Sequence, residues 1–476
     1  MLASMSELPE GIEPAPIPEP KDSALGIVVR RSSRGALEVL MGRRARGARF
    51  MPGHLAFPGG KLELGDQPGR PGALERCASR EIQEETGVGI PPEAWHDAGE
   101  RTTPPFFSVR YRTRFFVADA PGACDLPATL PAPEEIESLG FHDPADVSAE
   151  WEAGRALVPP PLLPILRMMD LERPASAVAL AARIEAINRE EEPNPRIEFE
   201  PGVWVLPLRT RTLPPASCTN VWMPGGRRFV VIDPGSAEPA ENEKLLRVVD
   251  RRVRQGCRVE AVVLTHHHRD HVSGAATIAA ALRVPVMAHS DTLARLAREL
   301  LGVATRALAD GDEIDLDGMS LRALHTPGHA PGHLAFFDAR RRVLIAGDLV
   351  SGLSTILVGF ADGDMDAYLD TLARMAALAP RSVLPAHGPP LPGRVLEGAI
   401  AHREAREALV SAALGSAARP LAEVARDAYA DTPGAPAFLR ELQTGAHLRR
   451  LARRGDAVEH ANGSGWSRPP AAATSS

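Results

Sequence analysis

The sequence predicts a multidomain α/β protein, and three observations support this prediction. Its 476 residues exceed what one hydrophobic core usually organises, and domains of about 150 residues would give roughly three of them. Strand-like apolar runs alternate with helical patterns over most of the chain, which is typical of layered α/β domains. After residue 392 the pattern becomes mainly helical, which indicates a separate C-terminal part.

Composition narrows the class of protein. The formal net charge of -7 argues against a broadly basic nucleic-acid-binding protein. The four cysteines are scattered without C-x-x-C spacing, so a reducing compartment is expected, and neither a disulfide framework nor a cysteine zinc site is indicated. We find no secretory leader and no run of about 18 apolar residues. These features predict a soluble cytoplasmic protein without a membrane partner.

The first half of the chain predicts one small mixed α/β domain. Residues 1–21 are rich in Pro and Glu and are expected to be a disordered lead-in. The domain itself is expected over residues 22–170, with β-type runs around one strongly helical segment at 73–86. The β-type runs cover residues 24–29, 37–41 and 106–118.

The remaining boundaries follow from changes in pattern. A polar run punctuated by Pro, residues 188–195, predicts a linker over 171–196. Strands then alternate with helices, including helices at 290–301 and 366–378, so a layered α/β domain is expected over 197–391. Residues 392–468 predict three helices and a terminal hairpin, the outline of a winged helix, and 469–476 a disordered tail.

One motif in the second domain carries metal-ligand chemistry. It follows the apolar run 259–264 and reads Thr265-His266-His267-His268-Arg269-Asp270-His271. Imidazole and carboxylate are ligands that zinc prefers, and alternation sends His266 and His268 to one side while Asp270 and His271 turn toward another. The spacing therefore predicts two metals. Further ligands are expected where other strands end, and His329, Asp348 and His387 occupy such positions.

This set resembles the metallo-β-lactamase superfamily in its five-motif form. The resemblance implies that His266, His268 and His329 hold one zinc ion and that Asp270, His271 and His387 hold a second. It also implies that Asp348 bridges both ions and that Asp233 is the structural acid of the first motif. Two such ions, about 3.5–4 Å apart, can share a water whose pKa falls from 15.7 toward about 7, which supplies a metal-bridged hydroxide. Hydrolysis is the expected reaction, with Asp270 or Asp348 as the proton acceptor.

The nearby histidines have simpler interpretations. His267 is expected to point away from its neighbours, while His289 and His325 are expected to pack at strand ends or to support ligands. His333 either supports a ligand through a hydrogen bond or donates a proton to a leaving group, and the first role is favoured.

Several segments further resemble the lactamase-beta-like subfamily, whose members carry a C-terminal winged helix. They include Thr219-Asn220-Val221-Trp222 and His402-Arg403-Glu404-Ala405-Arg406-Glu407, although Ala386 stands where that subfamily usually has Gly. One branch cleaves single-stranded RNA, so RNA endonuclease activity is one hypothesis and thioester hydrolysis of the glyoxalase II kind is the alternative. The run at 449–454 either contacts phosphates or is a solvated helix face.

A second metal site is predicted in the first domain. On the helix at 73–86, Glu81, Glu84 and Glu85 fall at i, i+3 and i+4, so three carboxylates share one face. Such oxygen ligands suit Mg²⁺ or Mn²⁺, which would in turn bind a diphosphate. Arg80 is expected to form an ion pair that orients a glutamate, and Gly87 is expected to end the helix.

Together with Gly59-Gly60, this helix resembles a Nudix box, which implies cleavage of a nucleoside diphosphate-linked substrate with Glu84 and Glu85 as catalytic residues. Asp66 stands where the box usually has Glu, and the longer loop 67–79 precedes Arg80. Together with Arg43-Arg44 and residues 50–54, the insertion resembles Nudix enzymes that cleave coenzyme A. The expected partner is a nucleotide or coenzyme A type molecule. A domain that senses a nucleotide without cleaving it is the competing hypothesis.

Overall fold

The computed structural model describes residues 13, 15–48, 51–122, 124, 126–191, 196–359, 362–460 and 465–470. It divides into two compact units, Pro16–Leu206 and Pro207–Ser476. Several expectations fall on residues outside this description: most of the lead-in at 1–21, Phe50, the turn of the C-terminal hairpin at 461–464, and the tail at 471–476. In the part of the chain that is described, no helix is long and apolar enough to cross a bilayer.

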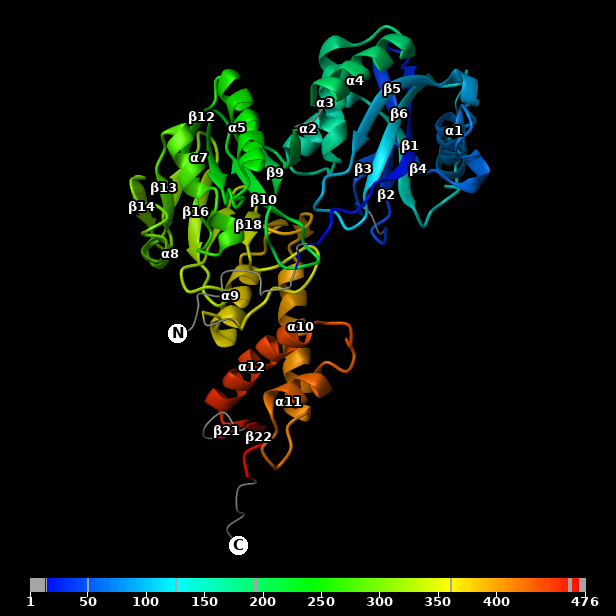
Figure 1. Cartoon of the computed structure of the whole chain (residues 1–476). Coiled ribbons are helices and arrows are strands. Elements are labelled where there is room, and N and C mark those ends of the chain that lie inside the picture. Colours follow the sequence, from blue (N-terminus) through cyan, green and yellow to red (C-terminus); the bar gives the residue numbers. More distant parts are fainter. Residues whose placement is uncertain are drawn as a thin grey trace. The chain divides into compact units, whose positions relative to one another are not determined.

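The first unit is built on one seven-stranded sheet (Figure 1). Its strand order is β3-β2-β1-β6-β5, with β4 paired to β1 and β7 paired to β2; β1 and β6 are parallel. The strands are β1 (Lys21–Arg31), β2 (Leu37–Arg44), β3 (Leu55–Ala56), β4 (Gly59–Lys61), β5 (His96–Thr102), β6 (Tyr111–Asp119) and β7 (Ile136–His142). Residues 106–109, expected within a strand, instead form a turn and a bend before β6.

Both faces of this sheet are covered, because successive strand residues alternate between two cores. Val28 and Leu40 pack with Ile82 of α1 (Ala73–Thr86) on one face. Ile27 and Met41 point to the other face. There they meet α2 (Pro144–Glu152), α3 (Leu163–Glu172) and α4 (Ala177–Glu191). The result is an α/β/α sandwich, which agrees with the small mixed α/β domain expected here.

Helix α4 occupies most of the stretch expected to be a linker. Leu180 and Ile184 are buried in the core of the first unit. Near the helix end, the Asn188 amide accepts a hydrogen bond from Arg101 Nε at 2.7 Å and donates one to the Ala98 carbonyl oxygen at 2.8 Å. The polar residues at 188–191 therefore lie on a docked helix, and the linker of 171–196 is corrected: the first unit extends to Leu206.

The second unit has two sheets facing each other. The first has the order β14-β13-β12-β11-β10-β9-β8 and is parallel from β11 to β14, and the second has the order β15-β16-β17-β18-β19-β20. Strand β8 (Ile197–Glu200) belongs to the first unit, and β9 (Val203–Arg209) crosses the boundary. The remaining strands are β10 (Cys218–Pro224), β11 (Arg228–Ile232), β12 (Arg258–Val263), β13 (Val286–His289), β14 (Thr305–Leu308), β15 (Glu313–Asp315), β16 (Ser320–His325), β17 (Leu334–Asp338), β18 (Val343–Gly347), β19 (Ser382–Pro385) and β20 (Leu391–Pro392).

Helices cover the outer faces of these sheets, so the layered α/β domain expected here has an αβ/βα arrangement (Figure 1). Helices α5 (Pro239–Arg254) and α7 (Ala275–Leu282) pack on β12, with the short α6 (Arg269–Val272) and α8 (Ser290–Arg295) nearby in the chain. On the other sheet, Leu372 of α9 (Met365–Ala377) and Leu396 of α10 (Val395–Ala412) share a core with Val383.

The C-terminal part contains three helices and a small sheet. These are α10 (Val395–Ala412), α11 (Leu421–Ala428), α12 (Ala437–Arg454) and the antiparallel pair β21 (Val458–His460) and β22 (Gly465–Ser467). Their core joins Val410, Val424, Leu448 and Trp466, one from each helix and one from the sheet.

Candidate metal centre

The candidate ligands of the second unit all lie where strands end. Asp233 follows β11, residues 266–271 follow β12, His329 follows β16, Asp348 follows β18 and His387 follows β19. A tight approach of backbones makes this convergence possible. At Gly328, where φ is 128°, a Cβ atom would overlap the backbone of Tyr368 on α9, so only glycine fits beside His329.

Three imidazoles form the first group of candidate ligands. His266 Nε2 and His268 Nδ1 lie 2.9 Å apart, His329 Nε2 lies 2.9 Å from His268 Nδ1, and His329 Nε2 lies 3.3 Å from His266 Nε2. A tetrahedral zinc site with bonds of about 2.0–2.1 Å separates its ligand nitrogens by about 3.3 Å. The three nitrogens therefore have a spacing that one divalent cation could occupy.

A carboxylate and two imidazoles form the second group. Asp270 Oδ2 lies 3.5 Å from His387 Nε2, and Asp270 Oδ1 lies 3.9 Å from His271 Nε2. These three residues also meet the spacing of a metal site. The structure thus brings together the residues that the sequence pairs with each expected ion.

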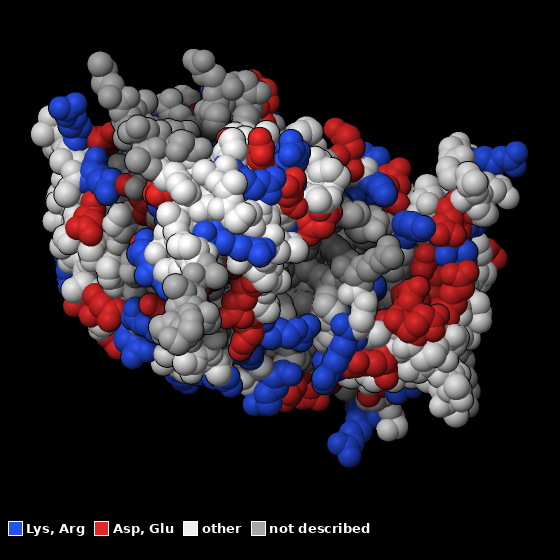
Figure 2. Space-filling view, turned by 90° about the horizontal axis from the view of Figure 1, so that it is seen from below, with Lys and Arg blue, Asp and Glu red and all other residues white. Residues whose placement is uncertain are grey.

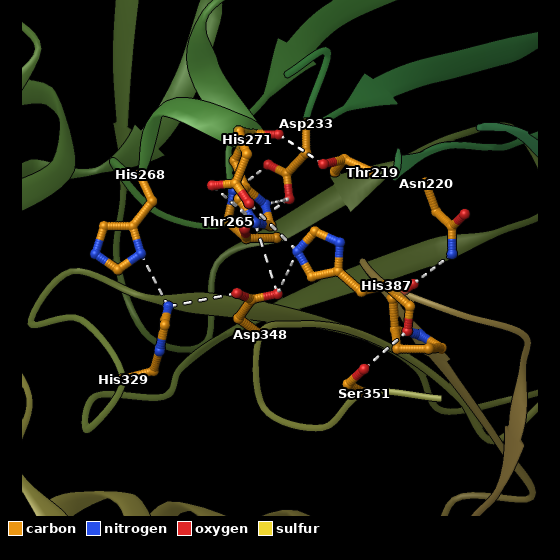
Figure 3. Close-up of polar contacts among 12 residues, drawn as sticks. Thr219, Asn220, Asp233, Thr265, His268, His271, His329, Asp348, Ser351 and His387 are labelled. Carbon is orange, nitrogen blue, oxygen red and sulfur yellow. Dashed lines mark hydrogen bonds and ion pairs between the residues drawn. The ribbon is translucent and has the colours of Figure 1, made fainter. Parts of the chain in front are cut away.

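Asp348 lies between the two groups (Figure 3). Its Oδ2 is 3.4 Å from His329 Nε2 in the first group. Its Oδ1 is 3.4 Å from His387 Nε2 and 3.6 Å from His271 Nε2 in the second. One carboxylate therefore faces both groups with different oxygen atoms.

Asp233 is not one of the candidate ligands but keeps them in position through hydrogen bonds. Its carboxylate accepts hydrogen bonds from the Thr265 amide at 2.8 Å, the Thr265 hydroxyl at 2.6 Å and His271 Nδ1 at 2.9 Å. Asp233 adopts the left-handed conformation, with φ of 54°, which Asp tolerates better than most residues. Because Asp233 binds Nδ1 of His271, the Nε2 atom of that ring faces the centre.

Two further histidines are oriented by backbone carbonyl groups. His329 Nδ1 donates to the Leu357 oxygen at 2.8 Å, and His387 Nδ1 donates to the Cys218 oxygen at 3.0 Å. Such bonds fix the tautomer that leaves Nε2 available to a metal.

Two further observations indicate that these imidazole and carboxylate groups suit divalent cations. The buried atoms His271 Nε2 and Asp348 Oδ1 have no hydrogen-bond partner, although both point into the centre. Burial lowers the pKa of His266, His268 and His329, and neighbouring imidazoles lower those of His266 and His268 further. Neutral imidazole is the form that binds metal, so these residues match divalent cations.

The other histidines of the region have structural partners. His333 is buried; its Nδ1 pairs with the Thr326 hydroxyl at 2.8 Å, and its Nε2 accepts from the Asp348 amide at 3.1 Å. His333 therefore supports the backbone of Asp348. His267 Nε2 lies 3.0 Å from Asp362 Oδ2, and the rings of His289 and His325 stack with centroids 4.3 Å apart.

Strand β10 contributes contacts that the sequence did not assign. The Asn220 amide donates to the carbonyl oxygens of Pro385 and Gly388 at 3.0 and 2.8 Å, and Trp222 Nε1 donates to that of Pro385 at 3.0 Å. These bonds hold the turn that carries His387. The motif Thr219-Asn220-Val221-Trp222 was noticed as a family cue, but only the fold shows what it touches.

A cavity of about 350 Å³ opens onto the candidate centre. His268, Asp270, His329, Asp348 and His387 lie on its inner wall. The C-terminal helices supply much of the rest and bring cationic side chains to it. These are Arg403 and Arg406 of α10 and Arg440 of α12, while Arg211 of the segment after β9 also lines the cavity.

The basic run at 449–454 is largely paired within the chain. Arg450 contacts Asp366 at 2.8 Å and also contacts Glu407. Arg453 contacts Asp364 at 3.1 Å as well as Asp366. These arginines join α12 to α9 and α10. The face drawn in Figure 2 also intersperses basic and acidic side chains without a continuous basic area.

In the first unit, Arg80 lies among the expected ligands. It forms a bidentate pair with buried Asp66, from Nε to Oδ1 at 3.0 Å and from NH2 to Oδ2 at 2.9 Å. Its NH1 also contacts Glu81 at 2.8 Å and Glu84 at 2.9 Å. Asp66 therefore anchors the arginine that orients both glutamates, as expected for Arg80.

Glu85 points to the Gly59-Gly60 loop and accepts a hydrogen bond from the Gly59 amide at 3.0 Å. Burial, followed by the charge of Glu81, raises the pKa of Glu85 to about 8. Among the described residues, the compact groups of ligand atoms all lie in the second unit, so Glu81, Glu84 and Glu85 share a helix face without forming such a group. A Cβ atom at Gly60 would meet the Glu81 carboxylate, so a larger residue there would displace that side chain.

Comparisons with known proteins agree with this geometry. Residues 211–387 match the metallo-beta-lactamase superfamily and residues 20–160 match the NUDIX domain. The fold and the two candidate sites define a metal-dependent hydrolase. The chain belongs to the metallo-beta-lactamase superfamily, since it is 30% identical over 229 residues to the lactamase-like protein vrtG of Penicillium aethiopicum, covering 45% of this chain and 69% of that one.

Other relatives overlap less completely. The chain is 30% identical over 200 residues to the lactamase-like protein adaB of Aspergillus niger, covering 41% of this chain and 58% of that protein's length. It is 27% identical over 158 residues to a hydroxyacylglutathione hydrolase of Bdellovibrio bacteriovorus, covering 33% of this chain and 57% of the relative. A beta-lactamase domain protein from Burkholderia ambifaria shares the fold, with a TM-score of 0.51, 22% identity and coverage of 58% and 93%.

Proposed function

We propose that the second unit is a binuclear zinc hydrolase. The convergence of His266, His268 and His329 on one side of Asp348, and of Asp270, His271 and His387 on the other, carries this proposal. When bound, two divalent cations would activate a water molecule and polarise the bond to be broken. Asp270 and Asp348 are the carboxylates able to take up the released proton, while Asp233 and His333 keep His271 and Asp348 in position.

We propose a thioester of a small anionic carrier as the substrate class. The cavity combines the candidate centre with cationic groups of Arg211 and Arg440, which suit a carboxylate or phosphate distant from the reacting bond. Likeness to a protein named hydroxyacylglutathione hydrolase supports the same chemistry.

Single-stranded RNA is the competing substrate. A winged helix made of α10 to α12, β21 and β22 would favour RNA, but the pairing of Arg450 and Arg453 with Asp364, Asp366 and Glu407 leaves fewer cations for phosphates. We therefore interpret the C-terminal part as a wall of the cavity.

The free cysteines support a reducing compartment such as the cytoplasm.

One panel tests the substrate class. The purified chain, loaded with zinc, is assayed against acyl-coenzyme A, a glutathione thioester and single-stranded RNA. Thioester turnover is expected, and Arg440→Ala is expected to raise KM about tenfold with little change in kcat, because a charged contact to the carrier is lost. Arg298→Ala, an exposed arginine of the same unit, is the matched control. RNA cleavage without thioester turnover would contradict this assignment.

For the first unit we propose a Mg²⁺- or Mn²⁺-dependent diphosphate hydrolase, with Glu81, Glu84 and Glu85 as ligands and a coenzyme A type molecule as a candidate substrate. Glu84→Gln and Glu85→Gln are expected to abolish release of the cleaved phosphate product, whereas Glu75→Gln on the same helix should not. A wild-type chain that binds nucleotide without turnover would instead support the sensor hypothesis.

A further inference from the structure

The first unit contains a second cavity, of about 260 Å³, that the metal chemistry does not explain. Its walls combine two kinds of side chain. Aromatic rings supply much of the apolar surface: Phe57, Phe107, Tyr111, Phe115 and Phe199. Cationic side chains supply much of the polar surface: Arg44, Lys61, Arg101 and Arg196. No aspartate or glutamate is found among its described lining residues.

Part of this wall lies beyond the segment that matches the NUDIX domain, residues 20–160. Pro161 and Leu162 follow that segment directly, and Arg196, Ile197 and Phe199 come from β8 and the residue before it, after helix α4. The cavity is therefore completed by a strand that is distant in sequence from the Nudix box.

Strand β8 contributes two apolar side chains to the cavity. Ile197 and Phe199 both line it, and the pairing of β8 with β9 shifts register between Glu198 and Glu200, which leaves Phe199 unpaired at a bulge. The Glu198 carboxylate accepts from Arg196 Nε at 3.0 Å and from the Gly202 amide at 2.7 Å. The ring of Phe199 also packs on Phe106, with centroids 6.1 Å apart. These contacts hold β8 beside the ligand space.

The cationic side of the cavity is also held in place. Arg101 is only 7% exposed, and the Asn188 amide oxygen of α4 accepts from its Nε at 2.7 Å. Gly59 and Gly60 line the same cavity, and the Gly59 amide donates to Glu85. The cavity thus adjoins the glutamate helix through this loop, which would place the phosphate of a ligand near Glu85.

We propose that this cavity binds a phosphorylated molecule through a flat apolar group, with Ile197 and Phe199 of β8 as specificity-determining residues. The aromatic walls take the flat group, and Arg44 and Lys61 take the anionic group. The position given to the phosphate rests on the proposed diphosphate chemistry. Binding of the flat apolar group to the cavity walls does not depend on any turnover.

The test uses three probes in metal-free buffer: 1-naphthyl phosphate, 1-naphthol and inorganic phosphate. Binding to the full chain is followed by naphthyl fluorescence and, for phosphate, by competition. The wild-type chain is expected to bind 1-naphthyl phosphate at least tenfold more tightly than either simpler probe. Phe199→Ala is expected to weaken that binding about tenfold, because most of one ring contact is lost. Arg44→Gln is expected to weaken binding of 1-naphthyl phosphate but not of 1-naphthol.

Leu171→Ala is the matched control, since Leu171 is an exposed apolar side chain of the same unit, 81% exposed. Its affinity for 1-naphthyl phosphate should equal that of the wild-type chain. Circular dichroism and thermal unfolding establish that Phe199→Ala and the more conservative Phe199→Leu are folded. Equal affinity in wild type and both folded Phe199 variants would overturn the proposal, and so would no preference for 1-naphthyl phosphate over inorganic phosphate. A failure of diphosphate cleavage would not affect these results, because no turnover is measured.

Discussion

The two candidate metal sites differ in how far their side chains are assembled without a metal. In the second unit, His266, His268 and His329 already place their nitrogens 2.9–3.3 Å apart. In the first unit, Glu81 and Glu84 instead contact Arg80, and Glu85 turns to the Gly59 amide. The ligand nitrogens of the second unit are therefore already close together, whereas the three carboxylates of the first unit contact Arg80 or the Gly59 amide instead.

The chemistry of the ligands accounts for this difference. Neutral imidazoles do not repel one another, and each can be fixed through its second nitrogen, as His329 is by the Leu357 oxygen. Carboxylates that share a helix face repel unless a cation lies between them. Arg80 supplies that positive charge, so an imidazole-rich site can be preassembled whereas a carboxylate site is completed when its cation arrives.

The largest effect is expected for Asp270→Ala in the candidate metal centre of the second unit. Loss of this carboxylate should lower kcat/KM about 1000-fold or more, because the second cation contributes several kcal/mol to the transition state. Hydrolysis of the substrate found in the panel and bound zinc measured by atomic emission are the readouts. Asp250→Ala, on the exposed face of α5, should leave both unchanged. Full activity in Asp270→Ala would break the assignment of the second group.

Arg80→Met tests whether this arginine supplies the positive charge that the carboxylates of the first unit need. It leaves Asp66, which is 2% exposed, buried without its counter-ion, so a loss of about 3 kcal/mol in the free energy of unfolding is expected. Urea unfolding of the full chain, followed by a probe in the first unit, measures this. Arg112→Met removes an exposed pair with Asp22 and should change stability little. Equal effects of the two substitutions would contradict the role of Arg80.

Asp233→Asn tests how much the positions of the ligands in the second unit depend on the hydrogen bonds that Asp233 accepts from Thr265 and His271. Asn tolerates the left-handed backbone at this position, but its amide nitrogen cannot accept a hydrogen bond from Thr265 or His271. Zinc affinity should fall roughly 10- to 100-fold, measured by competition with a chromogenic chelator. Asp317→Asn is closely matched, because Asp317 also has positive φ but is exposed, and it should bind zinc normally.

The smallest effect concerns pH. Because the pKa of Glu85 is raised to about 8, this carboxyl holds a proton at pH 7, and a metal must displace that proton. The apparent affinity of the first unit for Mn²⁺ should therefore rise about fivefold between pH 7 and pH 8, and about tenfold in all before it levels off above the pKa, as measured by electron paramagnetic resonance. Glu85→Gln should remove this dependence. An affinity that stays flat from pH 6 to pH 9 in the wild-type chain would contradict it.

The sequence predicted the local chemistry of both sites better than their surroundings. Helix 73–86 was predicted with the bounds that α1 has, because the i, i+3, i+4 spacing is local. The convergence of His329, Asp348 and His387 was predicted because ligands follow apolar strands. That Glu81 and Glu84 would turn to Arg80 was less accessible, since it depends on how one guanidinium is shared among three carboxylates.

Long-range partners could not be read from sequence. The pairing of Asn188 with Arg101 spans 87 residues and turns a polar helix end into a buried contact, whereas its composition indicated a linker. The pairing of Arg450 with Asp366 and Glu407 likewise converts a basic run into a helix contact.

Strand β8 and strand β9 have a consequence for any attempt to separate the two activities. The polar run at 188–195 looks like the natural place to divide the chain, yet Ile197 and Phe199, just beyond it, line the cavity of the first unit. Strand β9 follows at once, and Arg211 to Leu213, shortly after it, line the cavity of the second unit. Fewer than twenty residues thus serve two ligand spaces in succession. A fragment that ends at 196 would keep the Nudix box but lose Ile197 and Phe199 from the wall of the first cavity, so a change in its ligand binding could result from the cut itself.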